Sequence, residues 1–411
     1  MEGRELIPHL FRTEYSKIVA VLCHSFDLKH LEIAEDIASD TFLKAAETWG
    51  IRGVPENPAA WLYAVAKNRT KDYFRHNAVR EKQKKEAGQS GAFETEPEFE
   101  FTHQYIADSQ LAMIFSVCDP DVSADAQICL ALQILCGFSV EEISNAFLTN
   151  PETVKKRLQR ARAVLRSGNF RIKTLAEAEI SARADNVLKT LYLLFNEGYF
   201  SRTNDQLIRK DLCSEAIRLT SILTGNALTN TPRTNALLAL MYYQSSRFDA
   251  RTDEIGEVIL LENQDRSLWD AESIERGNHY LVNAFTGQEV SKYHLEAAIA
   301  YWHTTPTPGK KWENILALYD QLVLIEYSSI TLLNRIFAFA KVHGVEKGIR
   351  EAEKLNLNGS SHYHSLLGYL YADMDTTRSI EHYQAAIGLT NSKIEKQTLA
   401  KEVDRLKNRP V

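Results

Sequence analysis

Four side chains in one short stretch of the sequence could together hold an unstacked nucleobase. Their spacings of seven, four and three residues place them on one side of a helix: Trp61, Asn68, Asp72 and Arg75. Aromatic rings stack on the faces of bases, while cations beside them follow the phosphate backbone. Packing gives no obvious reason to mix a ring, an amide, an acid and a base. The pattern therefore indicates a contact with opened nucleic acid.

A second basic segment has the character of a helix that binds duplex DNA. Residues 151–173 contain eight lysines and arginines against one glutamate, a charge of +7. Lys156 and Arg160 lie opposite an apolar stripe, where they could reach phosphates and base edges in the major groove. The stripe consists of Val154, Leu158, Ala161 and Leu165.

The residues before this segment predict a helix-turn-helix. An apolar helix is expected over 128–135, Gly137 breaks it, and Ser139 with Glu142 has the spacing of a capping box. Asn150-Pro151 then begins the basic helix. Helix pairs separated by glycine are common in all-helical cores, so this pattern alone is weak. The basic outer face is what favours DNA binding.

The elements that must position these side chains are helices. Nearly every periodic segment has helical spacing, so the predicted fold class is all-α. A helix is expected over 31–45, and Asn57-Pro58 begins another that runs past Arg75. Between 87 and 108, glycines, a proline and alternating glutamates indicate an acidic, flexible linker, although such a run could also shield a basic groove.

The charge distribution indicates a polyanionic partner held at two places. The 411 residues carry a net charge of −6, yet residues 67–85 hold eight basic residues against two acidic ones. With 151–173 also set apart, the rest of the chain carries −19. Five cysteines without C-x-x-C spacing support neither disulfides nor a metal site, and no apolar run could span a membrane. We expect a cytoplasmic protein without a cofactor or metal.

The residues after 173 predict a longer series of amphipathic helix pairs. Leu367, Gly368 and Tyr371 imitate one tetratricopeptide repeat, but no strict period holds. Charged residues interrupt these apolar helices, which makes an enzyme a rival class. We favour helix caps and ion pairs, because no nucleophile and base are visible. The residues concerned are Glu197, Asp211, Glu215, Glu262, Asp265, Arg266 and Asp270.

Three motifs, in this order, resemble those of extracytoplasmic-function (ECF) sigma factors of the sigma-70 family. Residues 34–45 (AEDIASDTFLKA) resemble the helix that binds core polymerase, and 58–75 resemble the promoter-melting helix. Residues 136–162 resemble the second DNA-binding domain. The segments 191–199 (LYLLFNEGY) and 261–270 (LENQDRSLWD) are similar to the tetratricopeptide-like extension of one ECF subgroup.

The resemblance implies two partners, core RNA polymerase and promoter DNA. Polymerase contacts would fall on Glu35, Asp36, Asp40, Phe42 and Lys44. Contacts with the melted non-template strand of the minus-ten element would fall on Arg52, Trp61, Asn68, Lys71, Asp72 and Arg75. Contacts with the minus-thirty-five duplex would fall on Asn150, Glu152, Thr153, Lys155, Lys156, Arg157 and Arg160.

The predicted organisation has four parts. Sigma region 2 covers 1–86, the acidic linker 87–108, sigma region 4 109–173, and a regulatory helical-repeat domain 174–411. The last part could bind a protein partner or contact the sigma domains. The alternative is a one-component helix-turn-helix regulator with a ligand-sensing domain. That alternative predicts no polymerase surface and leaves the first basic helix without a purpose.

Overall fold

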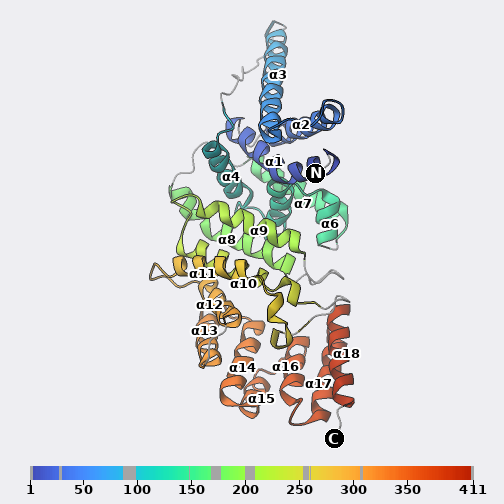
Figure 1. The fold of residues 1–411 in the computed structure, drawn as a ribbon, viewed down its shortest axis with the longest axis vertical. Helices are drawn as coiled ribbons and strands as arrows, with labels where there is room; N and C mark the ends of the chain where they lie inside the picture. The colour runs from blue at the N-terminus through green and yellow to red at the C-terminus, as the bar shows by residue number, and fades with distance from the viewer. Residues whose placement is uncertain are drawn as a thin grey trace. The chain divides into compact units, whose positions relative to one another are not determined.

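The computed structural model describes nine stretches of the chain, and in them it is helical with no β-strand (Figure 1). The predicted all-α class is therefore confirmed. The chain divides into two compact units, residues 1–193 and 194–411. The described stretches are 3–26, 30–86, 99–147, 149–167, 177–199, 209–252, 259, 261–305 and 309–408.

The first unit is built around α1 (Gly3–Phe26), whose Ile18, Val19 and Leu22 are buried. Both α2 and α4 pack against α1, so segments on either side of the predicted linker share one core. The other elements are α2 (Leu31–Arg52), α3 (Pro58–Glu86), α4 (His103–Val117), α5 (Ala124–Leu130), the π-helical turn η2 (Ala131–Leu135), α6 (Val140–Ala146), α7 (Pro151–Ser167) and part of α8 (Glu177–Tyr199).

The helix after the predicted linker begins earlier than its sequence suggests. Apolar periodicity becomes clear near Leu111, but α4 starts at His103, because the Thr102 hydroxyl accepts a hydrogen bond from the Tyr105 amide at 3.2 Å. Residues 87–98, which carry most of the predicted linker, lie outside the described stretches. Phe99, the first described residue of the predicted linker, is buried and stacks edge-on against Phe101 in the first unit.

The predicted turn between the last helices is present. Gly137 has a φ of +70°, a left-handed conformation that suits glycine after a helix. The Ser139 hydroxyl accepts from the Glu142 amide and the Glu142 carboxylate accepts from the Ser139 amide, which completes the capping box. The predicted apolar stripe of α7, from Val154 to Leu165, is buried.

The first unit extends beyond the predicted boundary at residue 173, because most of α8 belongs to it. The buried Gln127 amide is fully hydrogen-bonded, because its oxygen accepts from Asn186 at 3.0 Å and from Thr190 at 2.6 Å. Arg183 also forms a 2.9 Å salt bridge with Asp119. These contacts make residues 183–190 part of the core that supports α5, not a loose tether.

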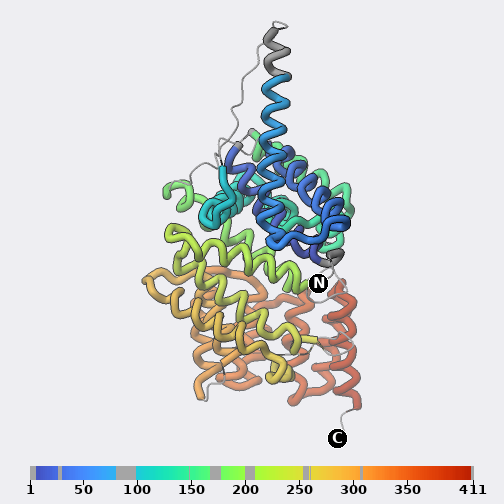
Figure 2. The backbone as a smooth tube through the Cα atoms, turned by 45° about the horizontal axis from the view of Figure 1, so that its top comes forward, coloured from blue at the N-terminus to red at the C-terminus, as the bar shows by residue number. Residues whose placement is uncertain are grey.

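The second unit consists of successive helices that pack against their neighbours (Figure 2). Two glycines permit close approach within helix pairs: an added methyl would lie 2.7 Å from the Tyr243 ring at Gly277 and 2.8 Å from the Tyr383 ring at Gly368. The helices are α9 (Lys210–Thr224), α10 (Pro232–Ser245), α11 (Ala271–Ala284), α12 (Lys292–Thr304), α13 (Lys311–Ile325), α14 (Ser329–His343), α15 (Val345–Glu353), α16 (Ser361–Tyr371), α17 (Thr376–Leu389) and α18 (Lys393–Lys407), with the 3-10 turns η3 (Phe248–Ala250), η4 (Leu261–Asn263) and η5 (Arg266–Leu268).

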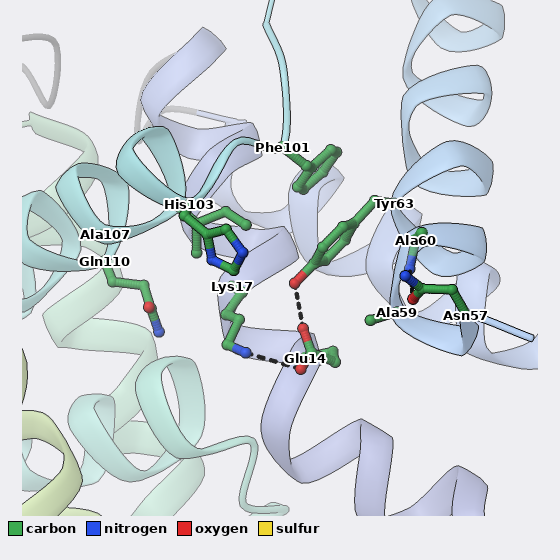
Figure 3. Close-up of a pocket in the computed structure, with 11 residues that line it drawn as sticks. Glu14, Lys17, Asn57, Ala59, Ala60, Tyr63, Phe101, His103, Ala107 and Gln110 are labelled. Atoms are coloured by element: carbon green, nitrogen blue, oxygen red, sulfur yellow. Dashed lines mark hydrogen bonds and ion pairs between the residues drawn. The ribbon is translucent and has the colours of Figure 1, made fainter.

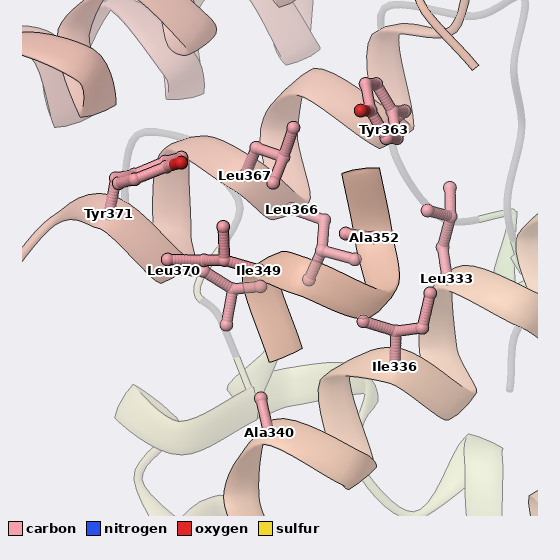
Figure 4. Packing of buried hydrophobic residues seen from close by; sticks show 10 residues of the cluster. All are labelled: Leu333, Ile336, Ala340, Ile349, Ala352, Tyr363, Leu366, Leu367, Leu370 and Tyr371. Carbon is pink, nitrogen blue, oxygen red and sulfur yellow. The ribbon is translucent and has the colours of Figure 1, made fainter. Parts of the chain in front are cut away.

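The core of this unit is assembled from adjacent helices. Ile336 of α14, Ile349 of α15 and Leu367 of α16 belong to one apolar cluster (Figure 4). Several charged residues that interrupt the apolar pattern have the structural roles that we favour. Asp265 caps η5 and Asp270 caps α11 through backbone amides.

Candidate nucleic-acid and polymerase interface

The exposed side of α2 carries most of the residues predicted to bind polymerase. Asp36, Asp40 and Lys44 are exposed, whereas the opposite side packs into the core. Phe42 is a correction, because it is only 5% exposed and its ring centre lies 5.1 Å from that of Phe11. A ring in this position supports the helix from within and cannot be counted as a contact residue.

An apolar side chain that the sequence analysis missed lies on the same exposed side of α2. Leu43 is 59% exposed, although leucine usually packs inside. Its exposure could have been foreseen from the helical period, because Leu43 falls between Asp40 and Lys44 and outside the buried series of α2. An exposed leucine among charged residues is typical of the apolar centre of a protein contact.

Glu35 of α2 is held by an arginine from α7. Arg162 donates two hydrogen bonds to the Glu35 carboxylate, both 2.7 Å, and a third of 2.8 Å to Gln133. The side chains of Arg162 and Glu35 are only 14% and 16% exposed. Burial opposes the charge on Arg162, but the hydrogen bonds and charge of Glu35 raise its pKa. Glu35 is thus occupied within the unit.

The predicted face of α3 is exposed along most of its length. Asn68, Asp72 and Arg75 are exposed, and Lys71 is half-buried. Trp61 is half-buried, with its ring centre 5.3 Å from that of Trp49 in an edge-on arrangement. Trp61 is therefore braced from one side and open on the other, as a stacking platform must be.

The loop before α3 is fixed by a helix cap. The Asn57 side-chain oxygen accepts a hydrogen bond from the Ala60 amide at 3.0 Å, as expected for an N-cap before Pro58. Arg52 ends α2 in an exposed position, and Gly53 follows with a φ of +81°. The loop therefore leaves α2 sharply and presents Arg52 beside the start of α3.

A cavity of about 530 Å³ lies on the other side of α3 (Figure 3). Tyr63 forms its wall, stacked on Phe101 at 4.5 Å between ring centres, and its hydroxyl donates to Glu14. Burial, and then the Glu14 hydrogen bond, raise the pKa of Tyr63. Lys17 donates to the same carboxylate at 2.8 Å. The cavity faces away from the Trp61 side, so the two surfaces are distinct.

Fewer basic side chains of α7 are without a salt bridge among the described residues than the sequence predicts. Lys156 and Arg160 are exposed and form no salt bridge with any residue that the structure describes. Arg157 instead turns toward α5, where it pairs with Asp125 at 3.3 Å. Lys155 pairs with Glu152 at 2.9 Å, which raises the pKa of Lys155 through that hydrogen bond and charge.

The remaining predicted DNA-contact residues sit at the start of α7. The Asn150 side chain accepts from the Glu152 amide at 2.8 Å and so caps the helix. Thr153 is exposed one position further on. The side chains of the first turn of α7 are therefore accessible, while its amides are capped by Asn150.

Comparison with known proteins identifies the first of these surfaces. Residues 10–80 match the family described as Sigma-70 region 2, and residues 183–285 match a family of unknown function, DUF6596. An uncharacterized protein of Rhizobium meliloti strain 1021 is 31% identical over 389 residues, 93% of this chain and 92% of that protein. The chain therefore contains a sigma-70 region 2 domain. No solved structure matches the chain.

The region 2 match supports a role for this part of the chain in transcription initiation. Most of α1, all of α2 and most of α3 fall in region 2, which supports binding to core RNA polymerase and promoter DNA. The second matched family begins at Arg183, inside α8 and therefore within the first unit. Among the described residues no helix is long and apolar enough to cross a bilayer.

Proposed function

We propose that this protein is an ECF-type sigma factor of the sigma-70 family with a regulatory C-terminal extension. In this proposal the exposed side of α2 binds core polymerase, and α3 with the loop 52–57 holds opened minus-ten bases. The helix-turn-helix of α6 and α7 reads the minus-thirty-five element as duplex. The observation that carries the proposal is the exposed pair Lys156 and Arg160, opposite a fully buried stripe on α7.

The contact between α2 and α7 describes an inactive arrangement in this proposal. The minus-ten and minus-thirty-five elements are about 25 base pairs apart, which is on the order of 85 Å along a duplex. Arg162 and Glu35 pair at 2.7 Å, so α3 and α7 cannot reach both elements while this pair is intact. Binding to polymerase at α2 would compete with Arg162 for Glu35 and thereby release α7.

Charge reversal on α2 tests the polymerase contact. Asp36→Lys combined with Asp40→Lys should abolish co-purification with core polymerase. Helicity should be unchanged, because Asp36 is exposed and the Asp40–Arg69 bridge is a surface pair worth under about 1 kcal/mol. The matched control reverses Glu346 and Asp373, two exposed acids of the second unit. Unchanged binding by the α2 variant would overturn the assignment.

Replacing Trp61 tests the melting role. Trp61→Ala should impair strand opening, measured by the reactivity of unpaired thymines, and should spare closed-complex binding to duplex. Leu62→Ala is the structural comparison, because Leu62 is fully buried and its loss should lower stability and both activities together. Equal loss of closed-complex binding in folded Trp61→Ala would contradict the melting role.

Truncation tests whether the C-terminal extension regulates transcription, and the contacts of α8 determine where the truncated chain should end. A chain ending near residue 174 would lose Asn186 and Thr190 and leave the buried Gln127 side chain without two partners. A chain ending at Tyr199 keeps all of α8. Higher transcription from that truncate would indicate autoinhibition, and lower transcription a required assembly surface. Full-length activity under every condition would refute regulation by the extension.

Dependence on core polymerase separates a sigma factor from the alternative, a one-component regulator, and the full-length chain and the truncate can both be tested for it. A one-component regulator would bind its operator without polymerase and would not stimulate promoter-specific initiation by core enzyme. A sigma factor should give run-off transcripts only in the presence of core polymerase.

A further inference from the structure

Three cations from separate segments of the second unit gather beside two tryptophans. Arg266 lies with its guanidinium carbon 5.1 Å from the Trp269 ring centre, and Lys311 has its ammonium 5.6 Å from that of Trp312. Arg247, in the turn after α10, joins them through the backbone, because the Asp270 amide donates to the Ser246 carbonyl at 2.8 Å. We call Arg247, Arg266 and Lys311 the cation cluster.

The cation cluster lacks the carboxylates that neutralise other cations of this unit. None of its members forms a salt bridge with a residue that the structure describes, whereas Arg335, for example, pairs with Asp320. The neighbouring acids have other partners. Asp265 and Asp270 accept from helix amides, and Glu262 pairs with Lys341 at 2.7 Å.

The imidazole of His303 lies close to the cation cluster. His303 of α12 lies with its ring centre 5.6 Å from that of Trp312. Burial, followed by the charges of Lys311, Arg247 and Arg266, lowers the pKa of His303 to about 3. Burial and then Arg266 and Arg247 also lower the pKa of Lys311, against the opposing charge of Glu262. The charges of Arg247 and Arg266 therefore act on both His303 and Lys311.

Three buried polar atoms of these residues have no hydrogen-bond partner in the part of the chain that the structure describes. They are the Nε of Arg247, the indole Nε1 of Trp269 and the Nδ1 of His303. Burying such an atom without a partner costs about 1–3 kcal/mol, and unpaired groups of this kind often mark the place of a missing ligand or ion. Two of the three are obligate donors, so the missing partner is an acceptor.

We propose that the cation cluster, with Trp269 and His303, binds a small phosphomonoester. A phosphate dianion has three acceptor oxygens, which matches two arginines and a lysine better than a single carboxylate does. The two indoles lie beside the cations and would give the ester group an apolar neighbour. Such a site would give the extension a chemical signal to respond to, and it does not depend on the polymerase assignment.

Direct binding to the full-length chain tests this proposal. Phenyl phosphate and inorganic phosphate are titrated by calorimetry at constant ionic strength, with chloride and malonate as reference anions. Phenyl phosphate should bind at least about tenfold more tightly than malonate, and inorganic phosphate should lie between them. Equal affinity for all the anions would overturn the proposal. Tighter inorganic phosphate than phenyl phosphate would refute the ester pocket.

Variants locate the site. Lys311→Gln and Arg266→Gln, which lie nearer the surface, should each weaken phenyl phosphate binding at least about tenfold. Arg247→Gln should do the same if it folds; the two outer variants decide the matter if it does not. Arg405→Gln, an exposed arginine of α18 paired with Glu402, is the matched control and should bind normally. Undiminished binding by Lys311→Gln and Arg266→Gln together would overturn the proposal.

A second readout does not depend on affinity. Phenyl phosphate is a monoanion at the pH where His303 titrates, and its charge would still stabilise the protonated ring. It should therefore move the imidazole titration, followed by NMR, upward by about one pH unit. Lys311, Arg247 and Arg266 are the charges that act on this ring, and Glu262 acts on Lys311. Binding without any shift of His303 would place the ligand elsewhere and refute the assignment.

Discussion

Two faces of α7 hold arginine in opposite environments. On the outer face Arg160 is exposed and, with Lys156, has no salt-bridge partner among the described residues. Two residues further on, on the face toward α2, Arg162 is nearly buried and makes two hydrogen bonds to Glu35 of α2. One basic helix therefore has one face open to a polyanion and another committed to an internal carboxylate. A run of positive charge in a sequence does not distinguish these roles.

The second unit provides a third environment for a cation. Arg247 is neither exposed like Arg160 nor paired like Arg162, since it lies beside Arg266 and Lys311. Its guanidinium donates to the Tyr199 hydroxyl at 2.9 Å, a neutral partner. The type of partner, not the number of charges, therefore distinguishes an exposed cation, a cation paired with a buried carboxylate and a cation with only a neutral partner.

The largest expected effect comes from breaking the Arg162–Glu35 pair. Arg162→Met should destabilise the first unit by about 2–4 kcal/mol, because the Glu35 carboxylate would stay largely buried without its partner. The loss is measured as a shift of the urea midpoint and as faster hydrogen exchange in α2 and α7.

A double variant separates the pair from its packing. Arg162→Met with Glu35→Gln should recover much of the stability, because the buried charge is then absent. If the single variant costs no more than an exposed pair, the two faces of α7 would not differ as the structure indicates.

The next effect concerns the exposed face of α7. Lys156→Ala or Arg160→Ala should weaken promoter binding by about 1–3 kcal/mol if the side chain contacts a base edge, with a loss that depends on sequence. If it contacts only phosphate, binding should fall similarly on all sequences and the salt slope should decrease by about 0.9. Binding to unrelated and promoter duplexes over a salt series distinguishes these results; no loss on either would exclude both contacts.

Structural features that depend only on residues close together in the sequence were predicted correctly. The capping box at Ser139, the left-handed Gly137 and the stripe of α7 need only neighbouring residues, and all are present. The sequence predicts a linker as far as residue 108, whereas α4 begins at His103, because its first turn is polar and is fixed by the Thr102 cap. The extent of the first unit depends on Gln127 meeting α8, a contact between distant residues that no periodicity encodes.

The residues of the candidate site were predicted from their types and helical spacing. The residues that they contact within the fold could be found only from the structure. Asn68, Asp72 and Arg75 are exposed together as expected. Phe42 proved to be core because Phe11 lies against it, and Arg157 proved to be paired because Asp125 lies beside it. Both corrections depend on residues far along the chain, whereas Leu43 could have been found from the helical period alone.

Acidification should destabilise the second unit through His303. The folded protein holds this imidazole neutral down to about pH 3, whereas the unfolded chain binds a proton below about pH 6.5. Stability therefore falls as the pH drops below 6.5, by about 2 kcal/mol at pH 5. Thermal unfolding at pH 7.5 and 5.0 measures this, and His303→Gln should remove that part of the pH dependence. An identical pH dependence in the variant would show that His303 is not desolvated.

The smallest effect is expected at Arg166, one turn beyond Arg162. Its guanidinium also pairs with a glutamate of α2, Glu32, at 2.7 Å, but the two side chains are 44% and 65% exposed. Water and salt screen such a pair, so Arg166→Met should cost under about 1 kcal/mol and the cost should vanish in high salt. The same urea series at low and high ionic strength provides the comparison. Because the residue type, the substitution and the partner helix match those of Arg162, a loss as large as that of Arg162→Met would mean that burial does not set the strength of the contact between α2 and α7.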